Sequence, residues 1–122
     1  MSDRPDFVVL HPDGHISYEH REVGETLADA VCRQLRPGSP GVGTMGYGPV
    51  RFWYHDLFTP ELASNPLANH VIGALGYRLP NGWAGPVAVS MEEDRATEQV
   101  PPLTPEVRYT LTALSALHTI PR

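Results

Sequence analysis

The first group of residues that could do chemistry is a glycine-rich stretch. Residues 41–46 satisfy the G-x-G-x-x-G spacing of dinucleotide-binding loops, whose glycines allow a tight turn and close approach of a pyrophosphate. Such a loop follows a strand and opens a helix whose N-terminus holds the phosphates. Here the stretch follows a predicted helix, lies between Pro40 and Pro49, and leads into a predicted strand. We therefore interpret residues 37–49 as a Gly/Pro-rich loop and expect no nucleotide cofactor.

The second group is a set of histidines near the N-terminus. His11 and His15 flank Pro12-Asp13-Gly14, and His20 follows one strand later. Histidine and aspartate at close spacing can ligate zinc. This spacing matches no established ligand pattern, and the Pro-Asp-Gly segment is already explained as a turn. We expect no metal site.

The third group would supply a nucleophile and its base. His55 and Asp56 are adjacent, and Cys32 is the only cysteine. Neighbouring residues of a strand point to opposite faces, so the side chains of this pair cannot orient one another there. Cys32 falls within a predicted helix, beside its apolar stripe, where a buried structural cysteine is common. The sequence has no Gly-x-Ser-x-Gly elbow either, so we predict no catalytic residues. A protein that is not an enzyme is favoured, although the question stays open.

Composition narrows the class of protein. The chain has 122 residues, of which 41% are hydrophobic and 19% charged, so residues 1–122 are expected to form a single globular domain. Its net charge is −5, and its nine basic residues, all arginine, are scattered, which disfavours nucleic-acid binding. The apolar runs are too short to span a membrane. One cysteine and no secretory signal lead us to expect a cytoplasmic protein.

Local patterns predict where the elements lie. Turn and capping residues precede several of them: Pro12-Asp13-Gly14 between two strands, Thr26 before the first helix, Asn65 with Pro66 before the second, and Thr104 with Pro105 before the third. We predict strands over residues 7–10, 16–20, 50–55 and 86–90, and helices over residues 26–35, 65–75 and from 104 onward. Residues 77–79 could extend as a hairpin partner of the last strand, and residues 92–103 form an acidic, proline-containing loop.

These elements predict an α+β fold. We expect a small, mostly antiparallel sheet of about four strands with three helices, in the order ββαβαβα, and with the helices on one face.

The strand over residues 50–55 suggests a binding surface. Alternation places half of its side chains on the core face and half on the other, namely Arg51, Trp53 and His55. If the helices cover one face only, these three residues lie on the open side of the sheet, a composition typical of binding hot spots. Trp53→Ala would then leave the thermal midpoint nearly unchanged. The alternative is that Trp53 is a second-side core residue under the glycine-rich loop.

Four segments resemble an uncharacterised family, the domain of unknown function 3846, found in small phage, plasmid and actinobacterial proteins. They are the opening strand with Pro12-Asp13-Gly14, the helix start Asn65-Pro66-Leu67-Ala68, the segment Gly85-Pro86-Val87-Ala88-Val89 before an acidic loop, and Leu103-Thr104-Pro105-Glu106. The resemblance covers most of the chain. It implies a bacterial or phage setting and brings no reaction or ligand.

Two functions remain open from the sequence. The first is a small non-catalytic accessory or regulatory protein that binds another, unidentified protein. The alternative is a small-molecule-binding protein or enzyme that uses residues 37–49 as a lid. A homodimer is compatible with either.

Overall fold

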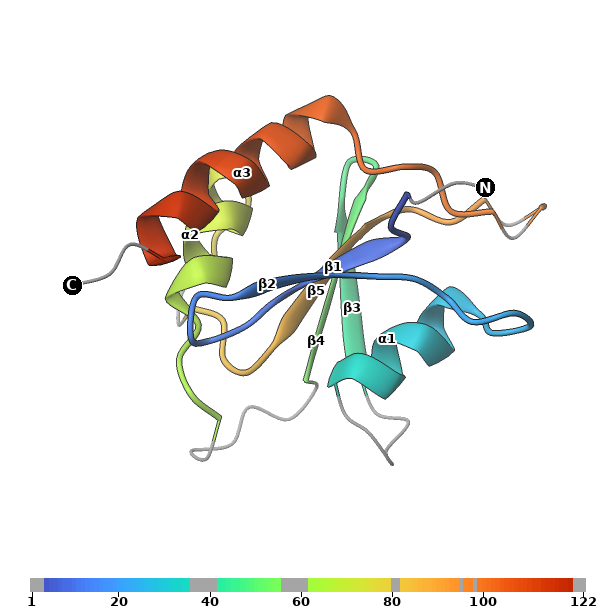
Figure 1. Ribbon diagram of the computed structural model, residues 1–122, viewed down its shortest axis with the longest axis horizontal. Helices are drawn as coiled ribbons and strands as arrows, with labels where there is room; N and C mark the ends of the chain where they lie inside the picture. The colour runs from blue at the N-terminus through green and yellow to red at the C-terminus, as the bar shows by residue number, and fades with distance from the viewer. Residues whose placement is uncertain are drawn as a thin grey trace.

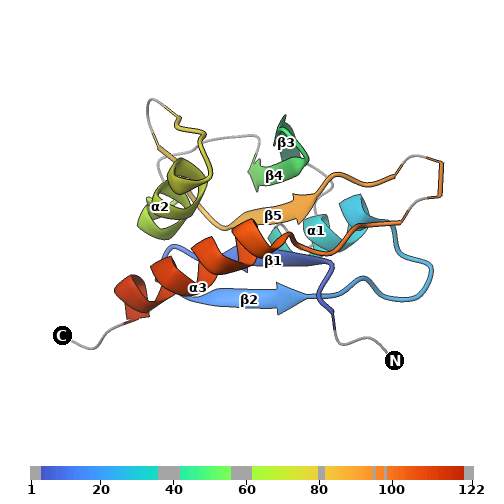
Figure 2. The same cartoon turned by 90° about the horizontal axis from the view of Figure 1, so that it is seen from above.

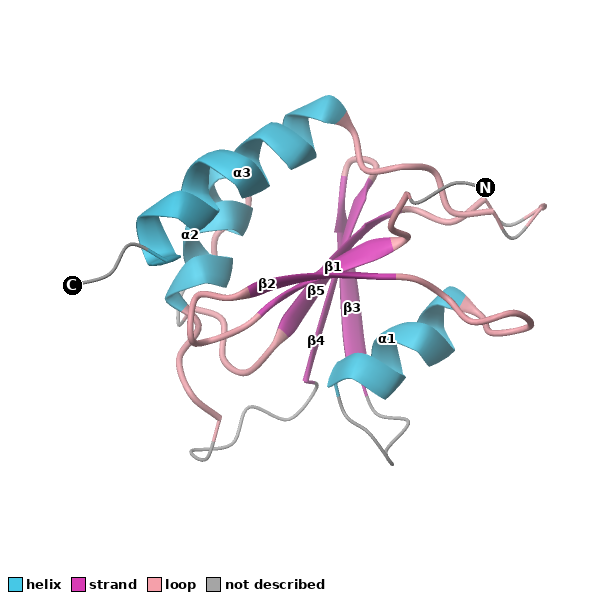
Figure 3. Ribbon diagram, in the orientation of Figure 1, coloured by secondary structure: helices cyan, strands magenta, loops and turns pink. Residues whose placement is uncertain are grey.

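Within the residues that the structure describes, three helices pack on one five-stranded sheet, which confirms the predicted α+β class (Figures 1 and 3). The computed structural model describes residues 4–35, 42–55, 62–79, 82–94, 96–97 and 99–119. None of the helices in these ranges is long and apolar enough to cross a membrane. The elements in chain order are β1 (Phe7–Leu10), β2 (Ile16–Glu19), α1 (Leu27–Leu35), β3 (Val42–Tyr47), β4 (Val50–His55), α2 (Pro66–Ala74), β5 (Val87–Met91) and α3 (Pro105–Thr119).

The sheet has one strand more than the sequence predicts. Its order is β2-β1-β5-β4-β3, and every neighbouring pair is antiparallel (Figure 2). The added strand is β3, which falls inside the predicted loop 37–49 and pairs with β4 along its whole length. The order ββαβαβα is therefore corrected to ββαββαβα. Residues 37–41 lie outside the described part of the chain.

The glycines of β3 serve strand pairing, and this explains why the segment reads as a loop. A Cβ at Gly43 would lie 2.6 Å from Cε2 of Tyr54, so only glycine lets the Tyr54 ring lie over this strand. The turn itself is confined to Gly48 and Pro49, with Gly48 at a φ of 61°. Because residues 42–47 are held in the sheet, they do not form the lid considered above.

Helices cover both faces of the sheet, so the predicted one-sided arrangement is wrong. α1 packs on the face that carries Phe7, Val9 and Ala88, which we call the α1 face. α2 and α3 pack on the opposite face, the α2/α3 face, over a larger set of apolar side chains that includes Val8 and Leu10. All four residues of β1 and all five of β5 are buried. Strands that are apolar on both sides require cover on both sides.

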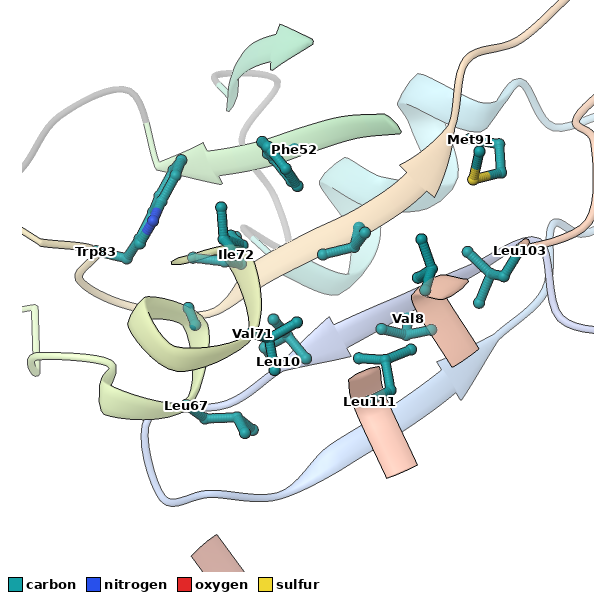
Figure 4. Packing of buried hydrophobic residues seen from close by; sticks show 14 residues of the cluster. Val8, Leu10, Phe52, Leu67, Val71, Ile72, Trp83, Met91, Leu103 and Leu111 are labelled. Carbon is teal, nitrogen blue, oxygen red and sulfur yellow. The ribbon is translucent and has the colours of Figure 1, made fainter. Parts of the chain in front are cut away.

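The core on the α2/α3 face contains an aromatic cluster, of which Figure 4 shows Phe52 and Trp83. Trp83 is 2% exposed, and its ring lies 5.6 to 6.4 Å from the ring centres of Phe52, Tyr54 and Tyr77. The edge-on and tilted geometries of these pairs are those that aromatic rings prefer. Tyr77 therefore contributes as a core side chain, and residues 77–79 are not the strand considered as a partner for β5.

Local hydrogen bonds confirm the predicted turn and helix starts. In the hairpin between β1 and β2, His11 N–H donates to the His15 carbonyl at 2.9 Å, and His15 N–H donates to Oδ1 of Asp13 at 2.9 Å. Thr26 Oγ1 accepts from the N–H of residue 29 at 3.1 Å at the start of α1. Thr104 Oγ1 accepts from the N–H of residue 107 at 3.3 Å at the start of α3. These contacts depend on neighbours in sequence, which is why the pattern predicts them.

Asn65 does more than begin α2. Its Oδ1 accepts from Ala68 N–H at 3.0 Å, as an N-cap should. Its Nδ2 donates to the carbonyls of Leu10 at 2.9 Å and Gly85 at 2.8 Å, and the side chain is fully buried. Its backbone N–H donates to the Trp83 carbonyl at 2.9 Å. One amide therefore joins the end of β1, the approach to β5 and the start of α2.

Asn65→Asp separates these two roles. Aspartate is as good an N-cap as asparagine, but its carboxylate would face two buried carbonyls that have lost their donor. We expect a loss of about 2–4 kcal/mol in the free energy of unfolding, measured by urea denaturation.

Thr26→Asp is the matched control, because it changes a cap whose side-chain hydrogen bond stays within its own helix, and it should change stability by less than about 0.5 kcal/mol. Equal stability of Asn65→Asp and the native chain would contradict the joining role of Asn65.

Candidate functional site

A cleft opens on the α1 face, between the start of α1 and the strands beneath it. Its volume is about 260 Å³. We call it the α1/β4 cleft. Its lining residues come from the start of α1, from β3, β4 and β5, and from the segment after β5: Thr26, Leu27, Ala28, Thr44, Arg51, Trp53, Met91, Glu92 and Glu93.

Trp53 forms the floor of the cleft and belongs to the core on the α1 face. The indole is half-buried, packs in the cluster with Val31 and Ala88, and donates from Nε1 to Oγ of Ser90 at 3.0 Å. Ser90 is fully buried. The expectation that Trp53 lies on an open face is wrong, because α1 packs on this face and Trp53 is half-buried against the cluster beneath it. The alternative, a second-side core residue, describes Trp53 better, although its cover is α1 and not a glycine-rich loop.

Arg51 lies two residues earlier on β4, on the same face, and closes one side of the cleft. Its Nη2 is 3.0 Å from Oε1 of Glu92, which follows β5. Glu93 pairs more loosely with Arg21, at 3.9 Å. The side chains of Glu92 and Glu93 are 51% and 36% exposed, against 28% for Arg51. The rim therefore presents carboxylates to solvent more openly than it presents the guanidinium.

The structure separates His55 from the other two predicted residues. Its Nε2 lies 3.0 Å from the carbonyl of Leu35, at the C-terminal end of α1, and it does not line the cleft. The predicted group thus divides, with Arg51 and Trp53 at the cleft and His55 at the opposite end of the helix. Asp56, its considered partner, lies outside the described residues.

An ion pair fixes the segment that leads into the cleft. Arg33 donates to both carboxylate oxygens of Glu25 at 2.9 Å, and its guanidinium also reaches the His20 carbonyl at 3.4 Å. The hydrogen bonds that Glu25 accepts from Arg33, and one from the backbone N–H of Glu22, lower the pKa of Glu25 to about 2. A bidentate pair of this kind restricts orientation as well as distance. It ties the chain before Thr26 to α1, so that the N-terminal lining of the cleft has a defined position.

Sequence reasoning missed Thr26, Thr44, Glu92 and Glu93 as site residues. Thr26 was explained by its capping role, and Thr44 lay in a segment interpreted as a loop. The two glutamates were part of an acidic connection, and Glu92 meets Arg51 only through the β4–β5 register, across 41 positions of sequence. A local pattern does not contain that register.

The other candidate groups do not converge on a site. The rings of His11 and His15 stack, with centres 4.6 Å apart, and His11 Nε2 lies 3.0 Å from Oγ of Ser17. In the part of the chain that the structure describes, no cluster of three histidine, cysteine, aspartate or glutamate residues could hold a metal ion. Cys32 is half-buried in α1, whose apolar side packs on the sheet.

No protein family, curated protein or solved structure matches this chain. The resemblance to the domain of unknown function 3846 therefore stays a prediction carried by its four segments. In the fold, those segments close the β1–β2 hairpin, start α2, enter β5 and start α3.

The hydrogen bond between Trp53 and Ser90 can be measured by a double-mutant cycle. Trp53→Phe should cost about 2–3 kcal/mol, because it leaves a buried hydroxyl without its donor and removes part of a ring. In the Trp53→Phe background, Ser90→Ala should lower the free energy of unfolding by about 1 kcal/mol less than it does in the native chain. The reason is that the hydrogen bond has already been lost in that background. Chemical denaturation of the four variants gives the coupling, and additive losses would contradict it.

His11 makes stability depend on pH. Burial lowers its pKa below the ordinary value of 6.5, and the nearby His15 lowers it further, against weaker opposing effects of Asp13 and Glu19. The unfolded chain therefore takes up a proton first as the pH falls, and the folded state loses stability from about pH 6.5 downward. Between about pH 7.5 and pH 5.5, the free energy of unfolding should decrease less for His11→Gln than for the native chain, as measured by urea denaturation. Parallel curves would contradict the assignment.

Proposed function

We propose that this protein is a small non-catalytic accessory or regulatory protein that binds another protein through the α1/β4 cleft. The observation that carries the proposal is the placement of Arg51 and Trp53 on one rigid strand at the floor and side of an open cleft. Tryptophan and arginine are the residue types most enriched at binding hot spots. Side chains held on a strand are positioned more accurately than those on a loop.

The size of the cleft favours a side chain over a whole cofactor. Its volume of about 260 Å³ is below the roughly 300–1,000 Å³ typical of pockets that enclose a small-molecule ligand. A single long side chain from a partner protein fits such a space. At this cleft, the size therefore supports a protein side chain over a small-molecule ligand.

The rim favours a basic side chain. Glu92 and Glu93 are the most exposed charged groups of the cleft, and the chain carries a net charge of −5. A lysine or arginine of the partner can lay its aliphatic stem along the Trp53 indole and place its charge beside these carboxylates. Contacts of this kind raise the rate of association and the dependence on salt more than they raise affinity.

We propose that this binding takes place in the cytoplasm of a bacterial or phage-infected cell.

Affinity capture from the native host, with mass spectrometry of proteins and small molecules, tests the proposal. The probe variant is Glu92→Gln/Glu93→Gln, which removes the rim charges while keeping their shape. The control variant is Glu22→Gln/Glu106→Gln, which makes the same charge change at exposed positions away from the cleft.

We expect a stoichiometric partner whose affinity falls about tenfold or more in the probe variant and by less than about twofold in the control. Binding of the native chain should also weaken as salt is raised. A partner retained equally by both variants would remove the cleft as its site. A metabolite retained in place of a protein would support the alternative function.

A further inference from the structure

The outer edge of β3 exposes backbone groups that have no strand beside them among the described residues. β3 ends the sheet, and β4 is its neighbour (Figure 2). The Pro49 carbonyl accepts from Glu92 N–H at 2.8 Å, so odd-numbered residues of β4 turn their backbone groups toward β5 and even-numbered ones toward β3. By the β3–β4 register, the residues of β3 that turn theirs outward are Val42, Thr44 and Gly46.

This edge lacks the features that usually prevent strands from pairing between molecules. Such features include charged side chains, proline and bulges. The sequence of β3, VGTMGY, has no charge and no proline, and its register with β4 is continuous. The opposite edge of the sheet is different, because β2 carries Glu19 and runs on into His20 and Arg21. Only the β3 edge is therefore open to a further strand without burying a charge.

We propose that the β3 edge binds a second copy of this chain, strand to strand and antiparallel, on a two-fold axis at Thr44. In this register Thr44 faces Thr44 of the second copy, and Val42 faces Gly46 of the second copy. The three outward residues of each strand then exchange about six backbone hydrogen bonds, two for each facing pair. The result is one continuous sheet through both copies.

Side-chain sizes and charges fit a second copy in this register. Each larger side chain faces a glycine, since Val42 meets Gly46 and Met45 meets Gly43, while the central threonines can form a cross-strand pair. Two copies of this acidic chain repel one another. A contact surface without charge, such as the β3 edge, is therefore more favourable for self-association than a charged one. The nearest charged side chain on this part of the sheet, Arg51, is already paired with Glu92 at 3.0 Å.

The two-fold axis also places both α1/β4 clefts on one face of the joined sheet. Antiparallel pairing of identical strands requires an axis perpendicular to the sheet, which keeps the α1 face of each copy on the same side. Thr44 lines the cleft and lies at the axis, so the two clefts are neighbours. The dimer stands independently of the protein-binding function proposed above, because its contacts are backbone groups of β3 and not the rim carboxylates.

Sedimentation velocity tests the pairing. Strand pairing alone buries less than the roughly 1,200 Å² of tighter interfaces, so we expect a weak dimer and measure it at protein concentrations of up to hundreds of micromolar. We expect the native chain to dimerise. Thr44→Lys sets two like charges against each other at the axis and should yield a monomer that keeps its far-ultraviolet circular dichroism spectrum. Tyr18→Lys, at an exposed position on the other edge strand, is the matched control and should dimerise like the native chain. Glu92→Gln/Glu93→Gln should also dimerise, which separates this test from that of the cleft.

Cross-linking tests the register. In a Cys32→Ser background, Thr44→Cys should form a disulfide-linked dimer on mild oxidation, and Tyr18→Cys should not. A native chain that stays monomeric at the highest concentration would overturn the proposal. So would a dimer that survives Thr44→Lys, faster cross-linking at position 18 than at 44, or an edge that pairs with a segment of another protein while this chain remains monomeric.

Discussion

The buried amide of Asn65 is the contact on which the arrangement of this fold depends. A sheet with strands as short as β1 cannot be aligned by length of pairing alone, and the helices of the α2/α3 face must still meet the right strands. Asn65 satisfies this requirement by holding the carbonyls of Leu10 and Gly85 with one nitrogen and starting α2 with its oxygen. Its side chain therefore contacts three segments of the chain that lie far apart in sequence. All of its polar side-chain atoms have partners, so its burial stabilises the fold where an unpaired amide would weaken it.

On the α1 face, polar contacts supplement a smaller apolar core. Among the described residues this face has a single helix, of nine residues, and the apolar cluster beneath that helix is the smaller of the two. Polar contacts supplement that packing: Glu25, just before α1, pairs with Arg33 in its last turn, and His55 contacts the Leu35 carbonyl at its end. Within the described part of the chain, the cleft exists because one short helix leaves part of this face uncovered near Thr44 of β3. Incomplete cover of an otherwise two-sided sheet is thus the physical origin of the candidate site.

The sequence predicted what is decided by near neighbours. Pro12-Asp13-Gly14 and the caps at Thr26, Asn65 and Thr104 act within a few residues, and all were confirmed. β3 was missed because the reason for Gly43 is the Tyr54 ring on the neighbouring strand. The cover of both faces was missed although the unbroken apolar run of β1 and the largely apolar sequence of β5 indicate it. For the site, Arg51 and Trp53 were correctly placed on one face by alternation, while Glu92 joined them through pairing that no local pattern contains.

The two tryptophans of the chain lie on opposite sides of the sheet. Trp83 is enclosed by the aromatic cluster of the α2/α3 face, and Trp53 is half-buried on the α1 face with its nitrogen on a serine hydroxyl. Their emission spectra should differ accordingly, with the indole of Trp53 in the more polar surroundings. Each side of the molecule thus contains its own intrinsic fluorophore. Fluorescence can therefore follow the opening of the face under α1 separately from that of the main core, without any attached dye.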